Sequence, residues 1–274
     1  MPDTLGQVRR FWNWYRRAQT CYQVHSPFVY QLCRHALEDD RHRYAFDDVE
    51  QLRRRLMRSP STLEMTDFGA GSRVTGTTTR QLAQVARDSA NGGARGRLLF
   101  RLVDFLKPDS LLEMGTSLGI GTLYQKFAAR NAPMISLEGC PQTAERARHH
   151  FDVLHRSEVD VRVGPFDETL PRALADLGKV DWLFNDGDHR YEPTLRYFEL
   201  TLPHVHADTV LAFDDIHWSD GMERAWCELR VHPRVRLSVD FYHCGLLFFR
   251  EEQREVEHYD LAPALWKPWM SLYS

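Results

Sequence analysis

Long apolar runs, export signals and a cysteine framework are all missing from this sequence. No stretch of about 18 apolar residues occurs, so no membrane-spanning helix is expected. The first residues, MPDTLGQVRRFWNWYRR, lack the apolar core and small-residue cleavage site of a secretory signal. The five cysteines are widely spaced and contain no CxxC pair, which favours neither a disulfide framework nor a zinc site. We therefore expect a reduced, cytoplasmic protein.

Charge is distributed unevenly along the chain. Residues 1–100 hold 16 Lys and Arg against 10 Asp and Glu, whereas residues 101–274 hold 19 against 28. A basic N-terminal part could attract an anionic partner such as nucleic acid. No nucleic-acid-binding motif accompanies the charge, so we favour solvated helix faces beside an acidic domain. No nucleic-acid partner is expected.

The first 95 residues predict a helical cap. In residues 5–17, Leu5, Val8, Trp12 and Tyr15 recur at helical spacing with arginines opposite them. Ser26-Pro27 predicts the start of a second, short helix. We interpret the aromatic residues of this cap as its interface with the rest of the chain; the alternative is an acceptor pocket. They are Phe11, Trp12, Trp14, Tyr15, Phe28 and Tyr30.

Residues 59–95 are rich in Ser, Thr, Gly and Arg, and predict a linker or a loop that folds over a site. Within them, MTDFGAGSR (65–73) imitates a cofactor-binding turn. It follows a poor buried strand, and no second strand with an acid comes after it. We interpret it as a substrate-side or lid segment, or as a plain surface turn.

From residue 96 the pattern becomes regular. Apolar strands are predicted at 110–114, 133–139, 159–164, 180–185 and 208–213, with helical stretches between them. This alternation predicts a parallel sheet covered on both faces. Residues 235–241 alternate in polarity and 245–250 follow closely, so these two strands must be antiparallel. The predicted fold class is α/β, with a doubly wound, mostly parallel seven-stranded sheet ending in a hairpin. It occupies residues 96–251, between the cap (1–95) and a C-terminal tail (252–274).

The turn after the first of these strands carries the pattern G-x-x-x-G-x-G at Gly115, Gly119 and Gly121. Glycines allow a close approach of the backbone to a ligand, and a helix N-terminus offers unpaired N–H groups. Glu138 ends the second strand, where an acid can accept hydrogen bonds from both hydroxyls of a ribose. Asp167, after the third strand, could meet an adenine amino group.

These motifs resemble those of the class I S-adenosylmethionine (SAM)-dependent methyltransferases, which have a Rossmann-like sheet. The similarity is greatest to the O-methyltransferase-like branch, whose first motif reads E-x-G-T-S-x-G. The HSPFVYQL and TDFGAGSR segments are similar to those of bacterial members with this N-terminal extension. The resemblance implies SAM as cofactor, bound by Glu113, Gly115, Thr116, Ser117, Gly119, Glu138, Gly164, Phe166, Asp167 and Asp186.

Acids and histidines follow the fourth and fifth strands, in NDGDHRYEP (185–193) and FDDIHW (213–218). They are Asp186, Asp188, His189, Asp214, Asp215 and His217. Clustered carboxylates repel one another unless a cation or a proton intervenes, and oxygen ligands favour Mg²⁺, Ca²⁺ or Mn²⁺ over zinc.

This second pattern resembles the divalent-metal-dependent O-methyltransferases. The resemblance implies Asp186, Asp214 and Asp215 as ligands of Mg²⁺ or another divalent cation. Where the catechol-type enzymes have a lysine shortly after the first acid, this chain has Asp188 and His189. A neutral His189 could accept the proton of a substrate hydroxyl, with Asp186 as the second catalytic residue. Alternatively, the acids only cap helices and bind no metal.

We therefore expect SAM-dependent methyl transfer, to a hydroxyl oxygen of a small-molecule acceptor. One rival hypothesis is a nicotinamide-dependent oxidoreductase, against which the glycine spacing and the terminal hairpin argue. Another is a SAM-binding module without turnover. The aromatic tail, LWKPWMSLY (265–273), could pack on the domain or mediate a homodimer.

Overall fold

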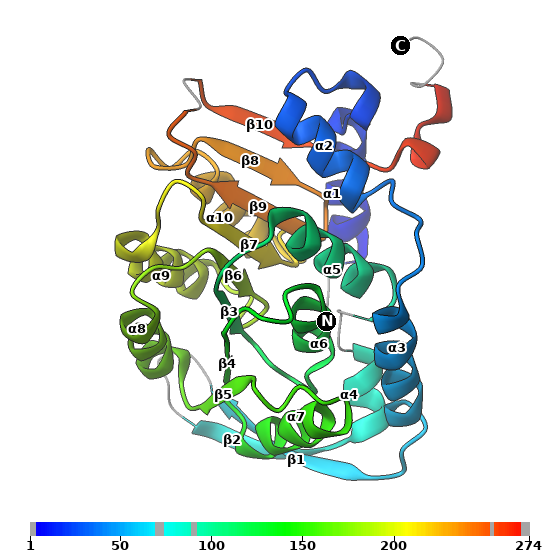
Figure 1. Ribbon diagram of the computed structural model, residues 1–274, viewed down its shortest axis with the longest axis vertical. Helices are drawn as coiled ribbons and strands as arrows, with labels where there is room; N and C mark the ends of the chain where they lie inside the picture. The colour runs from blue at the N-terminus through cyan, green and yellow to red at the C-terminus, as the bar shows by residue number, and fades with distance from the viewer. Residues whose placement is uncertain (1–3, 69–73, 89–91, 253–254, 270–274) are drawn as a thin grey trace. The chain divides into compact units, whose positions relative to one another are not determined.

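The computed structural model describes residues 4–68, 74–88, 92–252 and 255–269 (Figure 1). One large sheet has the strand order β10-β8-β9-β7-β6-β3-β4-β5. The prediction of seven strands is corrected to eight, because β10 (Glu257–Asp260) adds a parallel strand beside β8 (Leu237–Asp240). The predicted hairpin is confirmed, since β8 and β9 (Cys244–Phe248) pair antiparallel.

The contacts of the chain form two compact units, residues 41–178 and residues 1–40 with 179–274. These units do not coincide with the predicted segments 1–95, 96–251 and 252–274. Each unit contains strands of the sheet together with helices. Among the described residues, no helix combines the length and the apolar character needed to cross a membrane.

The unit 41–178 holds the first three parallel strands of the predicted alternation. Its strands are β1 (Thr62–Phe68), β2 (Val74–Gln81), β3 (Leu111–Met114), β4 (Met134–Glu138) and β5 (Asp160–Val163), and its helices are α3 (Tyr44–Leu56), α4 (Leu82–Asp88), α5 (Ala94–Leu106), α6 (Ile120–Ala128), α7 (Pro141–Val153) and α8 (Phe166–Leu177). Every residue of β3 is buried, as expected for a strand covered on both faces. Local signals set the ends of the helices: Pro141 begins α7, and left-handed Lys107 ends α5 just before Pro108.

The prediction of a linker or loop at 59–95 is wrong for most of its length. Strands β1 and β2 pair antiparallel from Thr62 opposite Gln81 to Phe68 opposite Val74, and α4 follows directly. The threonines that suggested a polar loop are β-branched, as is typical of strands, and Thr62, Thr78 and Thr79 are exposed. The backbone N–H of Glu64 donates to Oε1 of Gln142 at 3.0 Å, which ties the hairpin to α7. Residues 69–73, at the centre of the proposed lid segment, lie outside the described residues.

The unit of residues 1–40 and 179–274 contains the remaining strands. Its strands are β6 (Trp182–Asn185), β7 (Val210–Asp214), β8, β9 and β10; its helices are α1 (Thr4–Arg17), α2 (Pro27–Ala36), α9 (Tyr191–Thr201) and α10 (Asp220–Leu229), with short turns η1 (Cys21–Gln23), η2 (Leu202–His204) and η3 (Ala264–Trp266). Helix α2 packs Phe28 on Phe248 of β9, and α10 packs Trp226 on Gly245 of the same strand. Positions 245 and 248 point to opposite faces of a strand, so the two helices cover opposite faces of this part of the sheet (Figure 1).

Helix α1 does not bury its predicted apolar stripe. Leu5, Val8 and Trp12 are 84%, 62% and 56% exposed, whereas Arg10 and Trp14 are buried. The Arg10 guanidinium lies inside because it donates to three acceptors: the carbonyl oxygens of His217 (2.9 Å) and Trp218 (3.2 Å), and Oδ1 of Asp220 (2.5 Å). The periodicity predicted the helix correctly and its buried face wrongly.

The described part of the C-terminal tail packs on α1. The Tyr15 hydroxyl donates to the carbonyl oxygen of Trp266 at 2.6 Å, and the Lys267 ammonium lies 4.7 Å from the centroid of the Tyr15 ring. Of the two predictions for the tail, packing on the chain is confirmed for Trp266 and Lys267, whereas Leu265 and Trp269 are exposed. The suggested homodimer stays a prediction.

Candidate active site

The glycine-rich turn between β3 and α6 has a backbone that few side chains tolerate. Gly115, Ser117 and Gly119 have positive φ angles of 99°, 48° and 79°. A Cβ atom on Gly119 would come within 2.5 Å of the Phe151 ring. Glycine is required at 119 for both reasons, conformation and close packing.

Hydrogen bonds hold this turn in place. The backbone N–H of Gly115 donates to the carbonyl oxygen of Leu137 at 2.9 Å, and that of Ser117 donates to Oε2 of Glu138 at 2.7 Å. The carbonyl oxygen of Leu118 lies 2.9 Å from Nδ1 of His150. Burial lowers the pKa of His150, so a neutral imidazole with its proton on Nδ1 fits this contact.

Glu113 lies beneath the turn, with 1% of its surface exposed. Its Oε2 accepts hydrogen bonds from the hydroxyls of Thr122 and Ser136, both at 2.5 Å, and its Oε1 accepts one from Gln125 at 2.6 Å. The carboxylate therefore joins β3 to α6 and β4. Its predicted contact with SAM stays a prediction.

Glu138 and the turn after β5 are brought together by strand pairing. Glu138 is the residue of β4 opposite Val163, and the N–H of Gly164 donates to the Glu138 carbonyl oxygen at 3.0 Å. The Glu138 carboxylate also accepts from the N–H of Cys140 at 2.9 Å. A carboxylate has about four lone-pair sites, so it can accept further hydrogen bonds from a ligand. Phe166 and Asp167 stand half-buried in the first turn of α8.

The acidic cluster lies in the other unit and also follows from strand register. Asn185 pairs with Phe213 in the parallel ladder of β6 and β7, so Asp186 and Asp214 occupy equivalent positions after it. Asp215 follows with a φ of 52°. Nε2 of His189 lies 3.4 Å from Oδ1 of Asp186, and both side chains are half-buried. The structure thus unites His189 with Asp186, as the sequence predicted.

The surroundings of His189 bear on its charge. Burial opposes ionisation of the imidazole, but the hydrogen bond and charge of Asp186, with the charges of Asp215 and Asp214, raise its pKa to about 9. This direction favours a cationic ring beside the carboxylates. The neutral His189 that the sequence suggests stays a prediction.

The three acids do not converge at metal-binding distances. Within the described ranges, one group of three His, Cys, Asp or Glu residues has ligand atoms that all lie within 4.8 Å of one another. That group is Cys21, Cys33 and Glu38. Asp186, Asp214 and Asp215 are not such a group, so the ligand set that the resemblance implies is not assembled.

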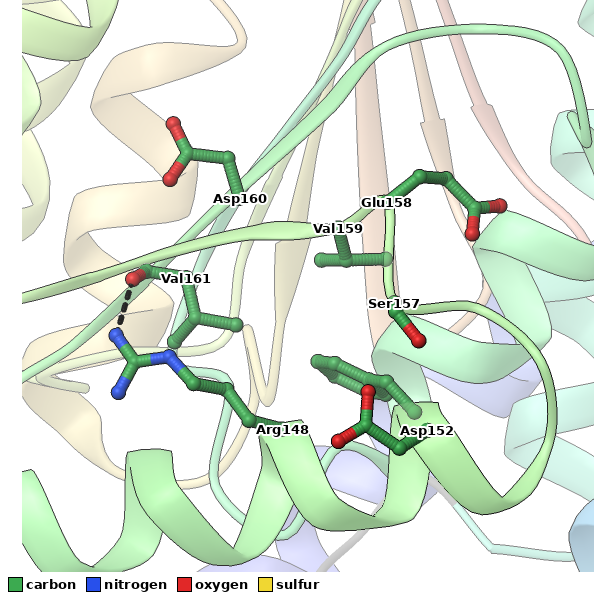
Figure 2. Close-up of a pocket in the computed structure, with 8 residues that line it drawn as sticks. Arg148, Asp152, Ser157, Glu158, Val159, Asp160 and Val161 are labelled. Atoms are coloured by element: carbon green, nitrogen blue, oxygen red, sulfur yellow. Dashed lines mark hydrogen bonds between the residues drawn. The ribbon is translucent and has the colours of Figure 1, made fainter.

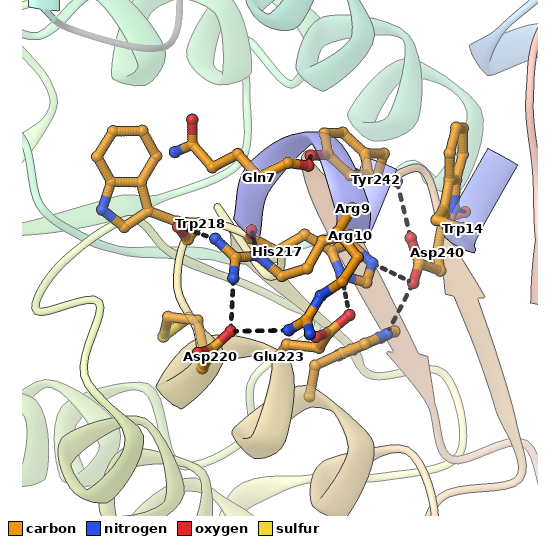
Figure 3. Close-up of polar contacts among 12 residues, drawn as sticks. Gln7, Arg9, Arg10, Trp14, His217, Trp218, Asp220, Glu223, Asp240 and Tyr242 are labelled. Atoms are coloured by element: carbon orange, nitrogen blue, oxygen red, sulfur yellow. Dashed lines mark hydrogen bonds and ion pairs between the residues drawn. The ribbon is translucent and has the colours of Figure 1, made fainter. Parts of the chain in front are cut away.

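Asp188 and His217, which also follow strand ends, contact structural partners. Asp188 forms a bidentate ion pair with Arg190, with Nη2 of Arg190 at 2.5 Å from Oδ2. His217 is buried, with its Nε2 at 2.8 Å from Asp240 and its Nδ1 at 3.3 Å from Glu223 (Figure 3). Asp240 belongs to β8, and nothing in the sequence near His217 indicated that partner.

A pocket of about 550 Å³ lies at the amino end of β5 (Figure 2). Arg148 and Phe151 of α7 line it together with residues 157–161, and Nη2 of Arg148 donates to the Val161 carbonyl oxygen at 2.6 Å. The predicted cofactor residues Gly164 to Asp167 follow the opposite, carboxyl end of this strand. The pocket therefore does not belong to the predicted cofactor site.

Comparison with known proteins identifies the fold. A family model described as a methyltransferase domain matches residues 112–216, a span that includes the glycine-rich turn, Glu138 and the acidic cluster. No curated protein matches the chain.

Three solved structures illustrate the likeness. Cofactor-bound Rv0187 from MTB has 24% identity and a TM-score of 0.53, over 60% of this chain and 83% of that one. The SAH-bound methyltransferase PaMTH1 of Podospora anserina has 16% identity and a TM-score of 0.58, over 83% and 97%. The O-methyltransferase TomG of Streptomyces achromogenes, in complex with SAM, has 16% identity and a TM-score of 0.52, over 77% and 91%. The predicted Rossmann-like methyltransferase fold is confirmed.

Proposed function

We propose that this chain, which has the class I SAM-dependent methyltransferase fold, transfers the methyl group of SAM to a hydroxyl oxygen of a small-molecule acceptor. The observation that carries the proposal is the turn Gly115–Gly119 anchored to Glu138. It occurs in a fold whose solved relatives include SAM- and SAH-bound methyltransferases. Four of the similar structures carry the word O-methyltransferase in their descriptions, which supports oxygen as the target.

Each part of the anchored turn has a role in the proposal. The backbone N–H groups at the start of α6 attract the carboxylate of SAM. Glu138 accepts hydrogen bonds from the ribose hydroxyls, since its two backbone donors fix its orientation. Phe166 and Asp167 contact the adenine, the ring by packing and the carboxylate by accepting from the amino group.

The acceptor is assigned to Asp186 and His189. An imidazolium cannot take a proton, so the raised pKa of His189 favours a different role from that of a neutral base. The acceptor hydroxyl gives its proton to solvent. The cationic ring donates a hydrogen bond to the resulting oxyanion, while Asp186 orients the ring. This role suits acceptors with acidic hydroxyls, such as phenols. In-line approach of that oxygen to the sulfonium methyl completes the transfer.

The acids do not form a three-ligand cation site in their observed arrangement. The ligand atoms of Asp186, Asp214 and Asp215 do not all lie within 4.8 Å of one another. No catalytic step is therefore derived through a metal. An assay in EDTA tests this directly, and full loss of activity that Mg²⁺ restores would contradict it.

Calorimetric titration with SAM, SAH and NAD⁺ tests the cofactor. We expect micromolar binding of SAM and SAH, and binding weakened at least tenfold in Glu138→Gln. Glu158→Gln, at a half-exposed position on the same unit, serves as the matched control. Binding of NAD⁺ in place of SAM would revive the oxidoreductase hypothesis and contradict the proposal.

Formation of SAH over a panel of phenolic acceptors tests turnover. His189→Gln should retain SAM binding and lose on the order of 10²-fold in turnover, the usual scale for one positioned catalytic group. SAM binding without transfer to any hydroxyl acceptor would instead favour the binding module. Transfer that is unaffected in His189→Gln would remove His189 from the mechanism.

A further inference from the structure

Two thiols and a carboxylate meet inside the unit of residues 1–40 and 179–274, and none of them belongs to the proposed active site. Cys21 comes from η1, Cys33 from α2, and Glu38 follows the end of α2. One ligand atom of each lies within 4.8 Å of the other two. Both cysteines are fully buried, while Glu38 is partly exposed. Eleven residues separate the two cysteines in the sequence, a spacing that matches no zinc-binding signature.

The backbone around these residues is firmly held. The N–H groups of Leu37 and Glu38 both donate to the carbonyl oxygen of Cys33, at 2.9 and 3.3 Å, which closes the last turn of α2. At η1, the N–H of Val24 donates to the Cys21 carbonyl oxygen at 3.4 Å. Three ligand atoms supplied by fixed segments need little reorganisation to bind an ion.

The Glu38 carboxylate has an outer partner of its own. Its Oε1 accepts a hydrogen bond from the backbone N–H of Ala264 at 2.7 Å. Outer hydrogen bonds of this kind orient metal-ligating carboxylates.

We infer that Cys21, Cys33 and Glu38 form a Zn²⁺ site with three protein ligands and a fourth position open to water. Thiolates select Zn²⁺ over the hard cations Mg²⁺ and Ca²⁺. With bonds of about 2.0–2.3 Å, the ligand atoms of a tetrahedral site lie roughly 3.5–3.8 Å apart. The three ligand atoms lie within 4.8 Å of one another, so small side-chain movements would bring them to that spacing.

The charge balance of the site is also favourable. Binding replaces the two thiol protons by Zn–S bonds, and both protons leave to solvent. The resulting group of one Zn²⁺, two thiolates and one carboxylate carries a net charge of −1. Arg34, next to Cys33 in α2, carries a positive charge that would balance this net charge.

Zinc at this position would link η1 and α2 to the C-terminal segment that contains Ala264. The ion would link η1 to α2 directly, and Glu38 would extend the link to Ala264. Because the folded chain offers the three ligands together, zinc binding would stabilise it against unfolding.

Zinc content and affinity test the inference. Chelator-treated full-length protein, kept reduced with a phosphine, is titrated with ZnCl₂ in competition with a chromophoric chelator. We expect one zinc per chain at submicromolar affinity, lost in Cys21→Ser and Cys33→Ser and weakened more than about tenfold in Glu38→Gln. Cys244→Ser removes a buried cysteine outside the cluster and should bind zinc normally. Asp214→Asn should also bind normally, which separates this site from the acidic cluster.

Cobalt provides a measurement that does not depend on variants that fail to fold. Co²⁺ added to the metal-free wild type should give a thiolate-to-cobalt charge-transfer band in the near ultraviolet. Reduced wild-type protein that binds no zinc at micromolar concentration would overturn the inference, and so would a cobalt spectrum without that band. Equal loss of zinc in Cys244→Ser would overturn it too.

Discussion

Replacement of Asp240 should cost this protein a large part of its stability. The Asp240 side chain is completely buried and accepts three hydrogen bonds, from Nε2 of His217 (2.8 Å), Nε1 of Trp226 (3.0 Å) and the N–H of Tyr242 (2.7 Å) (Figure 3). Burial opposes the charge of His217, but Asp240 and Glu223 raise its pKa to about 9, so the pair is ionic at pH 7.

The size of the loss follows from what Asp240→Ala would leave behind. Breaking a buried ion pair typically costs about 3–5 kcal/mol, because the remaining charge is left without its partner. The indole N–H and the Tyr242 N–H would also lose their acceptor, whereas release of the His217 proton limits the total. We therefore expect a loss of about 4 kcal/mol, and a smaller one for Asp240→Asn, which keeps the volume and one acceptor oxygen.

Urea unfolding at pH 7, followed by tryptophan fluorescence, measures this loss as a shift of the midpoint at constant slope. Asp220→Asn is the matched control, since Asp220 binds Arg10 of the same network but its side chain is 76% exposed. That variant should lose less than about 1 kcal/mol. A loss below 1 kcal/mol in Asp240→Ala, with an unchanged slope, would refute the reasoning.

Three further changes probe the unit that holds the proposed cofactor turn. Glu113→Ala leaves the buried donors of Thr122, Ser136 and Gln125 without their acceptor, and should lower the free energy of unfolding by roughly 3 kcal/mol; an unchanged melting temperature would contradict this. Gly119→Ala places a Cβ against Phe151 at a positive φ, and should lower the free energy of unfolding by about 1–3 kcal/mol and weaken SAM binding. Thermal shift with and without SAM measures both effects. An increase in melting temperature with unaltered SAM binding would rule the clash out. Burial lowers the pKa of His150 below its unfolded value, so the contribution of His150 to stability is present above pH 6.5 and is lost as the pH falls below that value. The urea midpoint should therefore fall more steeply between pH 8 and pH 5 in the wild type than in His150→Gln. Identical slopes in the two proteins would contradict this prediction.

Local patterns in the sequence were sufficient for seven of the eight strands of the large sheet and for the elements around the candidate site. Apolar residues that recur with a period of 3.6 or 2 predict a helix or a strand from nearby positions in the chain alone. Residues at the strand ends, such as Glu138 and Asp214, are found in the same way. Parallel strands then place their carboxyl ends in register, which is why Asp186 and Asp214 come to equivalent positions. The hairpin β1–β2 was not predicted because threonine is common in strands as well as in polar loops.

The sequence by itself determined the alternation of strands and helices, the glycine-rich turn and the acids at the strand ends, because each is specified by residues within one or two elements. Only the tertiary structure decided which face of α1 is buried, the partner of His217 and the meeting of Cys21, Cys33 and Glu38. Arg10 is buried by acceptors more than 200 positions away, and Asp215 and Asp214 add to the effect of Asp186 on the pKa of His189. Side-chain partners at such separations, and the pKa values they set, depend on distances in space, and only the folded chain defines those distances.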